Sequence, residues 1–266
     1  MNRTGPVTCF DRAIVRAPAP SVVGGLRAID RGDPSFAGVV AEHQAYVAAL
    51  GDAGLKVTVL PPLEAFPDSL FVEDPALVFS EGAILLRSAA TSRADEAAAI
   101  APFLRAEFDR VLELPGPGFV DGGDVLVTAG AVLVGLSSRT DRVGAEALCT
   151  LLARLGYHGE IVATPAGVLH LKTDCALLDD ETVLTTRRLA ASGLFRGRLR
   201  ELVTPQGEEA AANALRLNEV VLLGRDFTRT AEMLAAAGYS IVPMPTAEIS
   251  RIDAGLSCLS LRWRGT

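Results

Sequence analysis

The sequence predicts an α/β fold in which five similar strand-strand-helix-strand units close into a ring. Apolar runs end on proline at intervals of 40 to 54 residues, from Pro61 to Pro245. Pairs of short apolar runs with a polar or glycine break recur along the chain, and segments with helical periodicity lie in between. A unit of this kind cannot bury its apolar face alone, so five of them would close most economically around a central channel.

Each of the last four units opens with two short extended runs. The runs are separated by Ser-Glu-Gly, Ala-Gly, Asp-Asp-Glu or Asn-Glu, which are hairpin signals between β-branched stretches. The four predicted hairpins cover residues 76–87, 124–136, 175–186 and 214–224. A closing strand then runs into Pro115, Pro165, Pro205 or Pro245.

Helical periodicity predicts helices over residues 92–108, 140–156 and 228–238. Gly156 and Gly238 follow the last helical residues and are suited to end them. The first unit has a helix at 36–54 but only one strand before it, at 13–18, so CLSLRW at 258–263 could supply the missing strand and close the ring. The alternative is a doubly wound open sheet. Residues 1–266 are expected to form a single domain.

Composition limits the possible partners. The formal net charge of −7 argues against binding to nucleic acid or to anionic lipid and favours a small cationic ligand. Cys9, Cys149, Cys175 and Cys258 form no C-x-x-C pair, so neither a zinc ribbon nor a disulfide framework is indicated. No segment has the length and apolar character of a membrane span, and the opening residues lack the apolar stretch of a secretory signal. A cytoplasmic location is therefore expected.

His170 is the candidate general acid and base among the three histidines. It lies in GVLHLKTDC, at the opening of the fourth unit. His43 and His158 lie within or just after predicted helices and are expected at the surface. The alternative for His170 is a hydrogen-bonded residue of the core, which is a common role for a histidine in an apolar neighbourhood.

Cys258 is the candidate nucleophile among the four cysteines. It lies in RIDAGLSCLSLRW, after Gly255, which would permit an unusual backbone turn, and before a predicted strand. A thiol where a loop meets a strand can project into a central channel. Cys149 in a predicted helix, Cys175 in a strand and Cys9 near the start are expected to act as small hydrophobic side chains, and Cys258 could do the same.

Two groups of carboxylates lie in otherwise apolar stretches. Asp68, Glu73 and Asp74 occur in PDSLFVEDP, and Asp121 and Asp124 occur in GFVDGGDVLV. Burial of such groups is costly unless cations or hydrogen-bond donors accompany them, and a positively charged ligand is one possible partner. The alternative for the D-G-G-D string is a hairpin turn with capping carboxylates.

At these residues the chain resembles the dimethylarginine dimethylaminohydrolases. They belong to the guanidino-group-modifying superfamily, together with the arginine deiminases and amidinotransferases. The resemblance runs from the segment around Leu26 to CLSLRW, through AEHQAYVAAL, PDSLFVEDPALVF, VDGGDVLVT, VLVGLSSRTDRVGAEAL, GVLHLKTDC and DAGLSC. It implies the fold of that superfamily, a five-bladed α/β propeller (pentein), in agreement with the repeat of ββαβ units.

The resemblance also implies an activity and a mechanism. The reaction would be hydrolysis of Nω-methylated L-arginine to L-citrulline and methylamine or dimethylamine, through an S-alkylthiouronium intermediate on Cys258. His170 would be the acid and base, and the carboxylate of Asp121 would hold and polarise its imidazole. No cofactor or resident metal is expected, and Zn²⁺ on the thiol would inhibit. The partner would be a small guanidino amino acid, and the protein a monomer or a homodimer.

Substrate contacts follow from the same resemblance. Asp68, Glu73 and Asp74 would lie against the guanidinium, Arg93 and Arg139 would hold the α-carboxylate, Leu26 would cover the substrate from a mobile loop, and the carbonyl of Ile252 would receive the α-amino group. Without the resemblance, Arg93 and Arg139 would be assigned to surface salt bridges. Two other functions stay open: an arginine deiminase or amidinotransferase, and a non-catalytic propeller that binds a cation.

Overall fold

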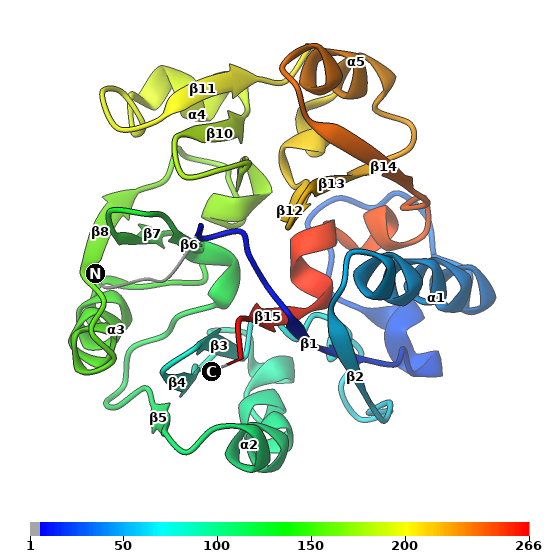
Figure 1. Ribbon diagram of the computed structural model, residues 1–266. Coiled ribbons are helices and arrows are strands. Elements are labelled where there is room, and N and C mark those ends of the chain that lie inside the picture. The colour runs from blue at the N-terminus through cyan, green and yellow to red at the C-terminus, as the bar shows by residue number, and fades with distance from the viewer. Residues whose placement is uncertain (1–5, 266) are drawn as a thin grey trace.

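The computed structural model describes residues 6–265, which form five three-stranded sheets placed around a common centre (Figure 1). The first five residues of the opening segment, used above for the expectation about location, lie outside this range. In each sheet the middle strand pairs antiparallel with one neighbour and parallel with the other. Parallel neighbours need a crossover connection, and a helix supplies it in every unit.

The second to fifth units follow the predicted order. The second has β3 (Ala76–Phe79), β4 (Gly82–Leu85), α2 (Glu96–Glu107) and β5 (Val111–Glu113). The third has β6 (Val125–Val127), β7 (Val132–Leu136), α3 (Arg142–Arg154) and β8 (Gly159–Ala163). The fourth has β9 (Cys175–Leu177), β10 (Thr182–Thr185), α4 (Arg187–Ser192) and β11 (Arg200–Val203). The fifth has β12 (Leu215–Leu217), β13 (Val220–Gly224), α5 (Thr228–Ala236) and β14 (Ser240–Met244).

The first unit closes the ring with both ends of the chain. It contains β1 (Arg12–Arg16), α1 (Phe36–Asp52), β2 (Lys56–Leu60) and β15 (Leu261–Trp263). β15 pairs antiparallel with β1, with Ile14 opposite Leu261. The predicted closure by CLSLRW is therefore confirmed, and the open doubly wound sheet is wrong.

Glycines end two of the predicted helices as expected. Gly156 and Gly238 have φ angles of 87° and 95° just after α3 and α5, a left-handed conformation that costs glycine no Cβ clash. The loops that enter the innermost strands are mostly short 3₁₀ turns, among them η3 (Gly122–Asp124), η4 (Leu171–Thr173), η5 (Glu209–Ala212) and η7 (Leu256–Leu259).

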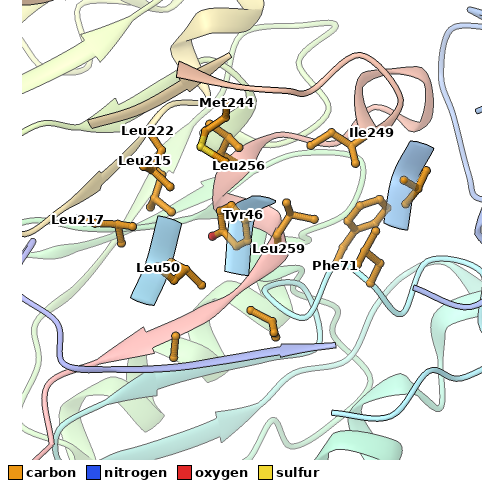
Figure 2. Packing of buried hydrophobic residues seen from close by; sticks show 14 of the residues in the cluster. Tyr46, Leu50, Phe71, Leu215, Leu217, Leu222, Met244, Ile249, Leu256 and Leu259 are labelled. Carbon is orange, nitrogen blue, oxygen red and sulfur yellow. The ribbon is translucent and has the colours of Figure 1, made fainter. Parts of the chain in front are cut away.

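A buried apolar cluster fixes one of these turns. Tyr46 and Leu50 of α1 pack with Leu215, Leu217 and Leu222 of the fifth sheet (Figure 2). Leu256 and Leu259, the first and last residues of η7, lie in the same cluster. Two buried leucines on either side of Cys258 thus anchor the turn that bears it. Burial of each is worth about 2 kcal/mol by area, so the turn is held firmly in place.

The surface position predicted for His43 is wrong. Its side chain is 5% exposed, and it lies on the buried stripe of α1 with Val39, Tyr46 and Leu50, at helical spacing. Burial lowers the pKa of His43 to about 4, so it is neutral at physiological pH. His158 is exposed, as predicted. Among residues 6–265, no helix combines the length and apolarity that crossing a bilayer requires.

Candidate active site

The predicted site residues lie on equivalent loops of different units. Asp74, Asp121, His170 and Cys258 each come shortly before the innermost strand of a sheet, namely β3, β6, β9 and β15. Because the units repeat in the same order around the ring, these loops meet at one end of its channel. Hydrogen bonds join them: the N–H of Glu73 donates to the carbonyl of Cys258 at 3.3 Å, and His170 contacts Asp121.

His170 is held by the third unit. Its Nε2 lies 3.3 Å from Oδ2 of Asp121. On the other side of the imidazole, a Cβ added at Gly123 would lie 2.6 Å from Nδ1, so the imidazole packs directly on the backbone of this glycine. Burial lowers the pKa of His170, but the Asp121 hydrogen bond and the charges of Asp74 and Asp124 outweigh it, and the net pKa is raised. The protonated imidazole is therefore favoured.

Asp124 holds the backbone beside His170. It accepts hydrogen bonds from the hydroxyls of Ser137 and Thr140 at 2.6 and 2.7 Å and from the N–H of Leu171 at 2.9 Å. The D-G-G-D string forms η3, and the hairpin turn of this unit lies between β6 and β7. The hairpin interpretation is therefore wrong for these residues. Burial raises the pKa of Asp124 despite the opposing charge of His170.

Arg93 is buried in the site, so its assignment to a surface salt bridge is wrong. Its guanidinium donates to Asp74 at 2.5 Å, to Glu96 at 2.7 Å and to the carbonyls of Asp68 and Phe71. Burial would raise the pKa of Asp74, but the charge of Arg93 outweighs it and keeps the pKa low. To hold a substrate carboxylate, Arg93 would have to use its remaining Nη1 proton or exchange a partner. That role stays a prediction.

Glu96 completes this charge cluster, and the sequence did not single it out. Its carboxylate accepts from both Nε and Nη2 of Arg93. Burial raises the pKa of Glu96 to about 7, although Arg93 opposes the shift. The TSRADE string contained the signal, since an acidic residue three positions after Arg93 can pair with it on one helical turn.

Asp68, Leu26 and Ile252 come together around Gly25. The N–H of Leu26 donates to Oδ1 of Asp68 at 2.9 Å, while the Leu26 side chain is 40% exposed. A Cβ at Gly25 would lie 3.1 Å from Asp68 and 3.6 Å from the buried side chain of Ile252. Burial raises the pKa of Asp68, opposed by Arg93. The arrangement leaves Leu26 free to cover a bound molecule, but its role and that of the Ile252 carbonyl stay predictions.

Glu73 links the second unit to two cations that the sequence did not single out. Its Oε1 lies 2.6 Å from Nζ of Lys172 and 3.2 Å from Nη2 of Arg262, and its Oε2 accepts from the Ser257 hydroxyl at 3.0 Å. Lys172 lies two residues after His170 in GVLHLKTDC, so its position near the site could have been inferred. Glu73 thus holds η7, the turn that bears Cys258, and its contact with a guanidinium stays a prediction.

A cavity of about 210 Å³ lies along the innermost strands. Glu73, Lys172, Ser257 and Arg262 are among the described residues that line it, whereas Cys258 and His170 are not. The cavity therefore adjoins Glu73 and its partners rather than Cys258 and His170.

Cys258 is half-buried on η7, and its N–H donates to the carbonyl of Gly255 at 3.2 Å. Burial and the charges of Glu73 and Asp74 raise the pKa of the thiol to about 11, with Lys172 opposing. The unusual turn expected at Gly255 is wrong, since its φ of −119° and ψ of 173° are extended. Glycine is required there for space: a Cβ would lie 2.0 to 2.4 Å from the amide of Asn213.

Arg139 has a side-chain donor near Asp121 that no described residue satisfies. Its Nη1 lies 3.8 Å from Oδ2 of Asp121 and finds no hydrogen-bond partner among residues 6–265, although it is buried. A buried donor without a partner is costly and suits an anionic ligand group. The geometry is compatible with a carboxylate clamp at Arg139.

Asp74, Asp121 and His170 offer ligand atoms within 4.8 Å of one another, a spacing that could hold a metal ion. The oxygens of Asp74, however, already accept from Arg93 and from the N–H of Gly123. A metal ion binds carboxylate oxygens directly, so it would have to displace these donors. These residues fit a hydrogen-bonded imidazole and its counter-charges better than a metal centre.

Comparison with known proteins shows the family to which this chain belongs. Residues 39–221 match the family model of arginine deiminase. The chain is 36% identical to the N(G),N(G)-dimethylarginine dimethylaminohydrolase of Pseudomonas aeruginosa over 96% of this chain and 100% of that protein. It is 33% identical to the enzyme of the same name from Streptomyces coelicolor, over 95% and 97% of the two chains.

A solved structure of the Pseudomonas aeruginosa enzyme, a Cys-to-Ser variant complexed with citrulline, is also similar. It has a TM-score of 0.92 and 35% identity, and the match covers 96% of this chain and 99% of the other. The chain belongs to the dimethylarginine dimethylaminohydrolase family, and the fold inferred from the repeat of ββαβ units is confirmed.

Proposed function

We propose that this protein hydrolyses Nω-methylated L-arginine, mono- or asymmetrically dimethylated, to L-citrulline and methylamine or dimethylamine. It would be a hydrolase of C–N bonds in linear amidines. One observation supports this above the others: side-chain atoms of Asp74, Asp121 and His170 lie within 4.8 Å of one another, and the N–H of the adjacent Glu73 contacts the Cys258 carbonyl. A guanidinium bound beside Asp74 would lie within reach of a nucleophile and an acid. The citrulline complex of the Pseudomonas aeruginosa relative agrees with the expected product.

Substrate binding activates the thiol in this mechanism. Without substrate, burial and then the charges of Glu73 and Asp74 raise the pKa of Cys258. A cationic guanidinium bound beside these carboxylates would offset their charge and favour the thiolate. The enzyme would thus form its nucleophile when the cationic substrate is present. Asp74 would orient the guanidinium N–H groups, since a charge-assisted pair fixes angle as well as distance.

His170 transfers a proton in each of the two covalent steps. The Cys258 thiolate attacks the guanidinium carbon, and the bond to the methylated nitrogen breaks as protonated His170 donates a proton to the departing amine. The neutral imidazole then takes a proton from a water molecule, which attacks the thiouronium carbon. The C–S bond breaks as the new C–OH group loses its proton to solvent, citrulline leaves, and the thiolate returns. Asp121, 3.3 Å from Nε2, would orient the imidazole through both steps.

A product assay tests the function. The protein is incubated separately with L-arginine, Nω-methyl-L-arginine and asymmetric dimethylarginine, and ammonia, methylamine, dimethylamine and citrulline are measured. Citrulline with the methylated amines supports the proposal. Ammonia from arginine alone would indicate an arginine deiminase, the description of the matching family model, and transfer to added glycine would indicate an amidinotransferase. Binding without any product would indicate a non-catalytic propeller.

The pH dependence of the free thiol is a first prediction. Because the pKa of Cys258 is raised to about 11, the thiol stays protonated at neutral pH and ionises only as the pH rises. Alkylation of Cys258 by iodoacetamide without substrate should therefore accelerate about tenfold per pH unit from pH 7 to 9. Peptide mass spectrometry measures the alkylation rate at Cys258. A rate that levels off below pH 8 would contradict this account of the thiol.

Arg139→Ala should weaken binding more than chemistry. Loss of a charged donor to the substrate carboxylate is expected to raise KM for methylarginine about tenfold or more with little change in kcat. Arg142→Ala is the control, since that side chain is 66% exposed at the start of α3. An unchanged KM for Arg139→Ala would remove it from the carboxylate clamp.

The sequence also predicted a cytoplasmic location and a monomer or homodimer, and both remain part of this proposal. The net charge of −7 supports a small cationic substrate rather than a polyanionic partner.

A further inference from the structure

The fifth unit, like the others, has a polar side chain in the loop that leads into its innermost strand. Asn213 follows η5 and comes two residues before β12, just as Asp74 comes two residues before β3. We propose that Asn213 positions Cys258 and donates a hydrogen bond to its sulfur, which stabilises the thiolate for attack. The inference deepens the proposed function, and it rests on Cys258 being the nucleophile.

The orientation of the Asn213 amide follows from its neighbours. The backbone N–H of Ser257 donates to Oδ1 of Asn213 at 3.2 Å, and an N–H can face only the oxygen end of an amide. Nδ2 therefore points the other way, and it lies 4.0 Å from Sγ of Cys258. This distance is at the long end for a donor to sulfur. A charge on the sulfur would strengthen the bond and shorten it.

Close packing holds the amide at the nucleophile turn. A Cβ at Gly255 would lie 2.0 Å from Cγ, 2.2 Å from Nδ2 and 2.4 Å from Oδ1 of Asn213, so all three atoms of the amide lie over the glycine. Asn213 thus contacts Gly255, Ser257 and Cys258, three of the four residues from 255 to 258. Through these contacts, Asn213 fixes the position of the turn and favours the thiolate form of Cys258.

The chemistry of the site explains why an amide suits this position. Glu73 and Asp74 disfavour the thiolate, and Lys172, which favours it, is already paired with Glu73. A second lysine or arginine at the sulfur would stabilise the thiolate but would repel the cationic guanidinium. A neutral N–H donor favours the thiolate without that repulsion.

The test measures the thiol directly. Asn213→Asp keeps the acceptor for Ser257 but places a carboxylate oxygen at the sulfur, and Asn213→Ala removes the amide. At pH 8, iodoacetamide alkylation of Cys258 should slow about tenfold or more in Asn213→Asp and less in Asn213→Ala, with the pH profile displaced upward. The kcat for methylarginine should fall in the same order, with KM changed less.

Asn218→Asp is the matched control. Asn218 donates to the carbonyls of Phe10 and Ala53 and, within residues 6–265, makes no hydrogen bond to a site residue, so its replacement should reduce stability and leave the alkylation profile unchanged. Asn213→Ser replaces Asn213→Ala should the latter not fold. Asn213 variants with wild-type alkylation profiles would overturn the proposal, even if their thermal stability falls. Alkylation uses no substrate, so an altered profile stands whatever the product assay finds.

Discussion

Replacing Cys258 with Ser should abolish turnover of methylarginine while the protein still folds and binds. A serine hydroxyl is a far weaker nucleophile at neutral pH, and loss of a nucleophile lowers kcat by about 10⁴-fold or more. The change removes little packing, because Leu256 and Leu259 anchor η7 on either side. Turnover is measured by citrulline release, and binding by calorimetry with asymmetric dimethylarginine.

Cys149→Ser is the control for this variant. Cys149 lies on α3, packs over Gly159, and should be replaceable without loss of kcat. Substantial citrulline release by Cys258→Ser would refute the covalent route.

Replacing Arg93 with Ala should cause the largest loss of stability among the site variants. The guanidinium is 6% exposed and pairs with Asp74 and Glu96, which are also buried. Removing one partner of a buried ion pair leaves uncompensated charge and costs about 3–5 kcal/mol in the free energy of unfolding. Urea unfolding at pH 8 measures this loss in the free energy of unfolding. The deficit should shrink at pH 5, because the carboxylates can then bind protons and lose their buried charge.

Arg105→Ala provides the comparison. Arg105 pairs with Glu113 at the surface, where the side chains are 55% and 64% exposed, and such pairs contribute about 0–1 kcal/mol. A loss for Arg93→Ala as small as that for Arg105→Ala would contradict the buried charge cluster.

The ring of five units could be predicted because the sequence signals for its strands, turns and helices are local. The proline that follows each closing strand, the hairpin breaks and the glycine after α3 reflect only neighbouring residues, and each local preference agrees with the final fold. Ring closure by β15 was also predictable, because the first unit lacked a strand. Polar residues in apolar stretches indicated Asp74, Asp121 and His170, since burial of such groups needs a partner.

Contacts between units could not be predicted from local patterns. Asn213 and Cys258 are 45 positions apart, and nothing near Asn213 in the sequence points to a thiol. Arg262 and Glu73 are likewise far apart in the sequence, and no local pattern indicates that they form a pair. The burial of His43 follows from its helical spacing with Val39, Tyr46 and Leu50, although its polar side chain favours a surface position. At Gly255 the need for space came from Asn213, in another unit of the ring.

The covalent role of Cys258 is the claim on which the account depends most. S-methyl-L-thiocitrulline loses methanethiolate, which leaves without a proton from His170 and becomes methanethiol in solvent, so a His170→Ala variant should still form the thiouronium but hydrolyse it slowly. Acid quenching followed by peptide mass spectrometry should find the citrulline skeleton, less one water, on Cys258. An unmodified Cys258 in a sample that has released methanethiol, or the label on Cys9, Cys149 or Cys175 instead, would contradict the account.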